Sequence, residues 1–210
     1  ATKAQILRSI RVSLLKRTSA NDSTIIYYAG HGRHTKENVV NDKYTLLCYD
    51  SMLADLIGTG ITIEELIESA YRSDPKKLFL FIDACEVGIS GVSEQLIKEI
   101  GTSDDKSLCI VTATRGYSAI DTPYGGVFTS ALLKSIAFLR NNPTPYCSAL
   151  IASIESTARE YKIPLPQSIH VGSENAWLLD GSQMEYECLI NSKKYVKRSD
   201  SLISKIGRAS

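Results

Sequence analysis

The sequence predicts an α/β fold with a mainly parallel central sheet and helices on both of its faces. Two kinds of segment in the sequence lead to this prediction. Short apolar runs typical of buried strands alternate along the chain with segments in which apolar residues recur at helical spacing. Strands that alternate with helices in this way pair in parallel, and the helices then cover both faces of the sheet. The length of 210 residues suits one domain with a sizeable core.

Each expected element has its own local signal. The opening helix carries Ile6, Ile10 and Leu14 at helical spacing. A later helix begins with a capping box, in which the Thr62 and Glu65 side chains each accept the other's backbone N–H. In chain order we expect a helix around 6–14, a strand at 24–28, an apolar run at 44–49, a helix at 62–72, a strand at 78–82, a helix at 92–100, a strand at 107–112, helices at 127–139 and 149–161, and short strands at 168–171 and 176–179.

The predicted elements divide the chain into one domain and a tail. Residues 1–180 are expected to form the domain, and residues 181–210 a polar, basic extension. A sheet of this kind normally opens with a strand, whereas this chain opens with a helix and starts at Ala1 rather than at a methionine. We therefore expect the sequence to be part of a longer protein.

The composition is that of an ordinary soluble domain, with 43% hydrophobic and 22% charged residues. A net charge of +1 predicts no direct binding to nucleic acid or to an anionic membrane. No apolar stretch is long enough to cross a bilayer, and the start does not resemble a signal peptide.

Five cysteines are scattered along the chain without a CxxC pair, which predicts neither a disulfide framework nor a metal site, and no cofactor is expected. Three of them, Cys48, Cys109 and Cys147, lie in or beside apolar segments and are expected to be small core residues. Cysteine usage of this kind favours a reducing, cytoplasmic setting.

Two short motifs follow two of the predicted strands. Tyr-Ala-Gly-His-Gly occupies residues 28–32 and Asp-Ala-Cys occupies residues 83–85. His31 and Cys85 would therefore emerge at strand ends, where α/β sheets carry their chemistry. A thiol becomes a good nucleophile beside a base such as imidazole, and the N–H groups of a glycine turn can face a developing oxyanion. The alternative is a buried cysteine and an unrelated turn histidine.

Together with Gly-Gly-Val-Phe-Thr-Ser-Ala-Leu-Leu at 125–133, these motifs resemble those of the caspase-like cysteine peptidases, in particular the bacterial caspase-like and metacaspase branch. The roughly 50-residue spacing from histidine to cysteine is also typical of caspases. The likeness runs from about residue 6 to 179 and lacks the family's first strand. It implies a caspase–haemoglobinase fold, Cys85 as nucleophile, His31 as base, and an oxyanion hole formed by the N–H groups of Gly32 and Cys85. Relatives often act behind a sensor in bacterial antiviral defence or cell death.

The sequence also departs from the metacaspase pattern. Glu-Val-Gly at 86–88 replaces the usual His-Ser-Gly after the cysteine, and Ala29 replaces a serine that often lines the pocket for P1, the residue before the scissile bond. The aspartate-rich calcium site of several metacaspases has no clear counterpart. Residues 104–105 are a weak candidate and are typical of a loop turn.

Two aspartates predict the residue that the peptidase prefers at P1. Asp83 lies two positions before Cys85, so both should face the same side of the sheet end. The string at 116–121 resembles the caspase segment whose arginine grips a P1 aspartate, with Asp121 in place of that arginine. An acidic pocket would favour Arg or Lys. The alternatives are a strand-end carboxylate that accepts backbone N–H bonds for Asp83, and a turn residue before Pro123 for Asp121.

The leading hypothesis is an intracellular cysteine endopeptidase that cleaves a protein substrate after Arg or Lys. A catalytically silent caspase-like scaffold is the main alternative. A flavodoxin-like binding domain is a third, for which only residues 88–91 approach a phosphate-binding loop. We expect an activating sensor domain or partner protein. Cleavage at Lys106, in a polar loop at 101–106, is the lesser option for control.

Overall fold

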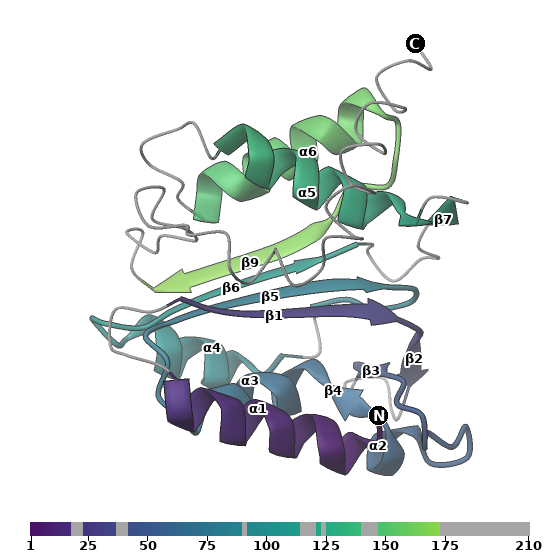
Figure 1. Ribbon diagram of the computed structural model, residues 1–210, viewed down its shortest axis with the longest axis vertical. Coiled ribbons are helices and arrows are strands. Elements are labelled where there is room, and N and C mark those ends of the chain that lie inside the picture. The colour runs from purple at the N-terminus through teal and green to yellow at the C-terminus, as the bar shows by residue number, and fades with distance from the viewer. Residues whose placement is uncertain are drawn as a thin grey trace.

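The computed structural model contains a four-stranded sheet in the order β1-β5-β6-β9 (Figure 1). The structure describes residues 1–17, 23–36, 42–89, 92–113, 121–122, 125–139 and 147–172. β1, β5 and β6 are parallel, and β9 pairs with β6 in the antiparallel direction at one edge. The strands span Ser23–Gly30 (β1), Lys77–Ala84 (β5), Ser107–Thr112 (β6) and Gln167–Gly172 (β9).

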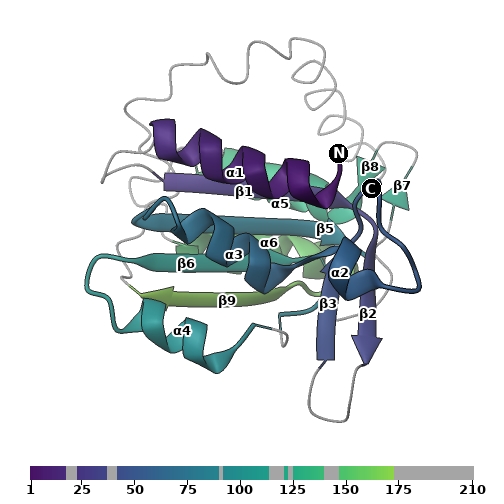
Figure 2. The ribbon, with the colours of Figure 1, turned by 90° about the horizontal axis from the view of Figure 1, so that it is seen from below.

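Helices cover both faces of this sheet, which confirms the predicted α/β architecture (Figure 1). One face carries α1, α3 and α4, and the other carries α5 and α6; Figure 2 shows the first of these layers lying over the strands. The helices span Lys3–Arg17 (α1), Ile63–Tyr71 (α3), Glu94–Gly101 (α4), Val127–Leu139 (α5) and Cys147–Glu160 (α6).

Strand β5 lies inside the sheet, between β1 and β6, and this position explains why its sequence is almost continuously apolar. Leu80 and Ile82 belong to the core under α1, α3 and α4, whereas Phe79 and Phe81 belong to the core under α5 and α6. Because both faces are covered, alternate residues are buried on opposite sides and the usual polar alternation is lost. Asp83 follows Phe79 and Phe81 on the α5 side of the strand.

The capping box predicted at residues 62–65 is present. Thr62 Oγ1 accepts the Glu65 N–H at 3.1 Å, and the Glu65 carboxylate accepts the Thr62 N–H at 2.9 Å. These two bonds satisfy end groups that the first turn of α3 leaves without helical partners.

A second, antiparallel sheet of β2, β3 and β4 lies beside the ends of β1 and β5 (Figure 2). These strands span Gly32–Lys36, Asp42–Leu46 and Ile61–Thr62, and the short helix α2 spans Leu56–Thr59. The sequence does not predict β2, because its residues are polar and lack the alternation of a half-buried strand. Cross-strand pairing with β3, rather than side-chain burial, defines it.

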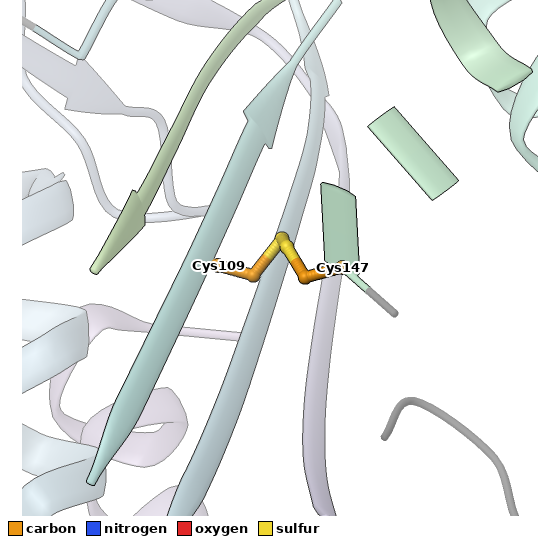
Figure 3. The surroundings of a disulfide bond; sticks show 2 residues. All are labelled: Cys109 and Cys147. Atoms are coloured by element: carbon orange, nitrogen blue, oxygen red, sulfur yellow. A yellow bond between two sulfur atoms is a disulfide. The ribbon is translucent and has the colours of Figure 1, made fainter. Parts of the chain in front are cut away.

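Cys109 on β6 and Cys147 at the first turn of α6 form a disulfide (Figure 3). Both are buried, so their predicted place in the core is confirmed, but they also form a disulfide, which the scattered cysteines did not predict. The reason is geometric: α6 packs on the sheet so that the two Cα atoms lie 6.5 Å apart, within disulfide range. The cysteines of this chain therefore no longer favour a reducing compartment.

The short hairpin β7–β8, Asp121–Thr122 and Gly125–Gly126, leads directly into α5. The strand predicted at 176–179 and the extension predicted at 181–210 lie outside the described residues. In the part of the chain that the structure describes, no helix has the length and apolar character needed to cross a bilayer.

Candidate active site

The two predicted motifs lie at neighbouring strand ends. β1 and β5 are adjacent and parallel, and their register pairs Gly30 with Ala84, so His31 and Cys85 each come one residue beyond that pair. Both strands end on the side of the sheet where β2 and β3 lie (Figure 1). Neighbouring strands are about 4.8 Å apart. The fold thus brings together a histidine and a cysteine that are far apart in the sequence.

The backbone of His31 is held by two donors. The Leu47 N–H donates to the His31 carbonyl oxygen at 2.9 Å, and the Tyr28 hydroxyl donates to the same oxygen at 2.8 Å. The Tyr28 hydroxyl also lies 2.9 Å from the Leu47 carbonyl oxygen, so its single proton is shared between the two carbonyl oxygens. Burial raises the pKa of Tyr28 to about 12, so the phenol remains a donor at neutral pH. This role is not predictable from the sequence, because nothing local links residue 28 to residue 47.

Gly32 packs directly on the loop that carries Cys85. It is buried, and a Cβ atom at this position would overlap the Val87 side chain and lie 2.5 Å from the Cys85 carbonyl oxygen. Only glycine allows the two backbones to approach so closely. The two residues predicted to supply oxyanion donors therefore lie against each other.

The turn after Cys85 has an unusual backbone. Glu86 has a φ of 51°, in the left-handed region that residues other than glycine seldom adopt. Its carboxylate oxygens lie 3.2 and 3.3 Å from Nη1 of Arg33 on β2. This ion pair links the cysteine loop to the strand that follows His31. The opposite charges of positions 33 and 86 are visible in the sequence, but only the fold makes them neighbours.

The Asp83 side chain is buried against the start of α5. It is 7% exposed, and its Oδ2 atom accepts the Thr129 hydroxyl and, at 3.3 Å, the Thr129 backbone N–H. Thr129 lies in the first turn of α5, where N–H groups lack helical partners, so Asp83 caps this helix from another element. This contact is the predicted alternative to a role in a P1 pocket. The carboxylate does make such a contact, and its role toward substrate stays a prediction.

The family model described as "Caspase domain" matches residues 1–164. The chain belongs to the caspase domain family. This confirms the resemblance to the caspase-like cysteine peptidases and makes the chain a cysteine peptidase domain by family, whereas the bacterial and metacaspase branch stays a prediction. Among solved structures, caspase-1 from Spodoptera frugiperda matches with a TM-score of 0.49 and 13% identity, covering 82% of this chain and 68% of that chain. No curated protein matches the chain significantly.

The hairpin of this caspase domain carries the second predicted P1 residue. The Asp121 backbone pairs with Gly126 in the β7–β8 hairpin. A Cβ atom on Gly126 would overlap Oδ2 of Asp83, so the hairpin lies directly against that carboxylate. The fold therefore brings the backbone of residue 121 close to Asp83. The side chain of Asp121 lies outside the described part of the structure.

Lys106 lies at the opposite end of the sheet from Cys85. Residue 106 precedes β6, whose first residue pairs with Lys77 at the start of β5, whereas Cys85 follows the last residue of β5. The Lys106 ammonium is 2.9 Å from Asp74 Oδ1 and 5.6 Å from the centre of the Tyr71 ring. Cleavage at Lys106 would therefore need a second molecule of the peptidase.

The aspartates at 104–105 are the weak candidate for a calcium site in this caspase domain. At the weak calcium candidate, Asp105 bonds to Lys76 and to the Ser103 hydroxyl, which is the loop-turn arrangement expected there. Among the described residues, no group of three or more His, Cys, Asp or Glu side chains is arranged to hold a metal ion.

Proposed function

We propose that this domain is the catalytic part of a cysteine endopeptidase that uses Cys85 and His31 as a dyad and cleaves after Arg or Lys. The observation that carries the proposal is the register of β1 and β5, which sets both residues one position beyond a single pair of strand partners. A caspase domain over residues 1–164 supports the same chemistry.

The reaction would proceed by acyl transfer. His31 takes the proton of the Cys85 thiol, and the thiolate sulfur attacks the carbonyl carbon of the scissile bond. The oxyanion that forms accepts hydrogen bonds from the Gly32 and Cys85 N–H groups. His31 then gives its proton to the leaving amine as the C–N bond breaks. A water molecule, deprotonated by His31, hydrolyses the thioester and restores the thiol.

Preference for a basic P1 residue rests on Asp83 and Asp121. The Asp83 carboxylate is buried on the same face of β5 as the start of α5, and the hairpin that carries Asp121 packs on it. A desolvated carboxylate attracts a cationic side chain and repels an anionic one. We therefore assign both aspartates to the P1 pocket.

Activation by a sensor domain or partner protein belongs to the same proposal. A partner can switch the site on only if it binds the assembled arrangement more tightly than the idle one. The ion pair of Lys106 with Asp74 supports this route over cleavage at Lys106. Turnover should depend on the full-length protein and its partner, and should survive Lys106→Ala. Full activity of residues 1–210 alone would contradict such control.

A covalent probe tests the proposed chemistry. In the full-length protein with its activating partner, peptide acyloxymethyl ketones with P1 Arg should label Cys85, as located by mass spectrometry, whereas matched probes with P1 Asp or P1 Leu should label it far more slowly. Cys85→Ala should abolish the label, and Cys48→Ala should retain it as a control. Labelling by no probe would instead support a catalytically silent scaffold, and preference for acidic or apolar P1 would refute the assigned pocket.

A further inference from the structure

A chain of three side chains from three different elements ends on the Asp83 carboxylate. The Tyr27 hydroxyl on β1 lies 2.7 Å from the Thr129 hydroxyl oxygen on α5, and the Thr129 hydroxyl in turn bonds to Asp83 Oδ2 on β5. The Thr129 backbone N–H reaches the same Asp83 oxygen at 3.3 Å. These three residues are far apart in the sequence. They meet only because the fold brings their elements together at this end of the sheet.

The direction of the hydrogen bonds follows from the chemistry of the groups. An ionised carboxylate can only accept, so the single hydroxyl proton of Thr129 goes to Asp83. The Thr129 oxygen is then an acceptor, and the Tyr27 hydroxyl must be the donor to it. Burial raises the pKa of Tyr27, so this phenol keeps its proton at neutral pH. The chain runs from Tyr27 through Thr129 to Asp83.

This chain fixes the position of the carboxylate. Two donors on one threonine hold Oδ2 from two directions, which sets the rotation of the carboxyl group. Gly126 packs against the same oxygen, because a Cβ atom there would overlap Oδ2. A carboxylate held in this way is pre-organised, so binding a charged partner costs it little reordering.

We propose that Thr129, and Tyr27 through it, are positioning residues that set the selectivity for a cationic P1 side chain by holding Asp83 in place. This inference rests on the proposed function, in which Asp83 lines the P1 pocket. Neither residue need touch the substrate. A purely structural role, in which Asp83 only caps α5, makes different predictions, because loss of a cap lowers the stability of the domain without distinguishing one P1 residue from another.

Replacing Thr129 separates these roles. Thr129→Val removes the hydroxyl at nearly constant volume, and Thr129→Ser retains it. In the full-length protein, Thr129→Val should raise KM for a P1-Arg peptide on the order of tenfold with kcat little changed, as expected when a bond that orients a charged group is lost. A P1-Leu peptide should be cleaved as by wild type. Thr129→Ser should restore the P1-Arg value, and Thr157→Val, at another buried threonine, should have no effect.

The outer link of the chain supplies a second variant that does not depend on the folding of Thr129→Val. Tyr27 is 46% exposed, so Tyr27→Phe should leave the fold intact. We expect it to raise the P1-Arg KM about two- to threefold, in the same direction and with the same selectivity. Urea unfolding of each variant gives the stability readout in parallel.

The results separate the positioning role of Thr129 and Tyr27 from the proposed P1 pocket and peptidase activity. Equal loss on P1-Arg and P1-Leu peptides, or unchanged kinetics in both Thr129→Val and Tyr27→Phe, would overturn the positioning role while leaving the peptidase assignment intact. A wild-type protein with no preference for P1 Arg would refute the assigned pocket, and the positioning role with it. That result appears in the wild type alone, before any variant is compared.

Discussion

At the scale of single residues, the contact between Gly32 and the Cys85 loop is the tightest constraint on the candidate site. A methyl group at position 32 would overlap Val87 and crowd the Cys85 carbonyl, and backbone atoms cannot move aside as a flexible side chain can. The same close approach keeps the two predicted oxyanion donors together. A small displacement of either loop therefore changes the geometry of the reaction as well as the packing.

Gly32→Ala should therefore lower both activity and stability. Overpacking of this kind costs about 1–3 kcal/mol of unfolding free energy, and the turnover of a P1-Arg peptide should fall by more than that loss of folded protein explains. Gly101→Ala is the matched control, since a Cβ there meets only the end of the Val171 side chain. Urea unfolding and kcat/KM measure the two effects. Wild-type activity in Gly32→Ala would show that this contact does not position the site.

At the scale of elements, the disulfide fastens α6 to the central sheet. Cys109 on β6 and Cys147 on α6 are 38 residues apart, so the bond closes a loop that would otherwise be free in the unfolded chain. Closing a loop of this length stabilises a fold by about 4 kcal/mol in the chain-entropy description. Both sulfurs are buried, which also keeps the bond from aqueous reductants.

Reduction should therefore shift the unfolding transition of the whole domain. In urea with a phosphine reductant, the midpoint should fall relative to the oxidised protein, and the double variant Cys109→Ala/Cys147→Ala should show no response to reductant. Thiol titration in denaturant should count two fewer thiols before reduction than after it. An equal thiol count in both conditions would contradict the disulfide.

Most elements were predictable because their signals are local. The helices at 62–72 and 127–139 and the strand at 107–112 follow from capping residues and apolar periodicity, and the structure has them within a residue or two. The polar strand β2 and the disulfide were not predictable, because each depends on a partner that only the fold supplies. For the site, the motifs indicated His31 and Cys85, whereas the contacts of Tyr28 and Thr129 join elements distant in sequence.

At the scale of the whole molecule, buried tyrosine side chains make the free energy of unfolding depend on pH in the alkaline range. Burial is the largest cause of the raised pKa of Tyr27, Tyr28 and Tyr71, and Tyr28 reaches about 12. A phenol whose pKa is higher in the folded state than in the unfolded chain binds its proton more tightly when folded. Its contribution to stability is complete below the unfolded value of 10.0 and is lost as the pH rises through the folded value.

The unfolding free energy should thus fall between about pH 10 and pH 12. Absorbance of tyrosinate, followed with circular dichroism after short exposure to base, measures ionisation and unfolding together. Tyr28→Phe should remove one late-titrating phenol and flatten the decline. A spectrum in which all tyrosines ionise near pH 10 while the domain remains folded would contradict the burial described for these side chains.

The central claim is that His31 and Cys85 act as one catalytic unit, and a double-variant kinetic cycle tests it most directly. The rate of cleavage of a P1-Arg peptide is measured for the wild type, Cys85→Ala, His31→Ala and the double variant, all in the activated full-length protein. Residues that act as a unit are strongly non-additive. Each single variant should lose nearly all turnover, and the double variant should be hardly slower than either. Wild-type turnover in Cys85→Ala, or losses that simply multiply in the double variant, would contradict the account.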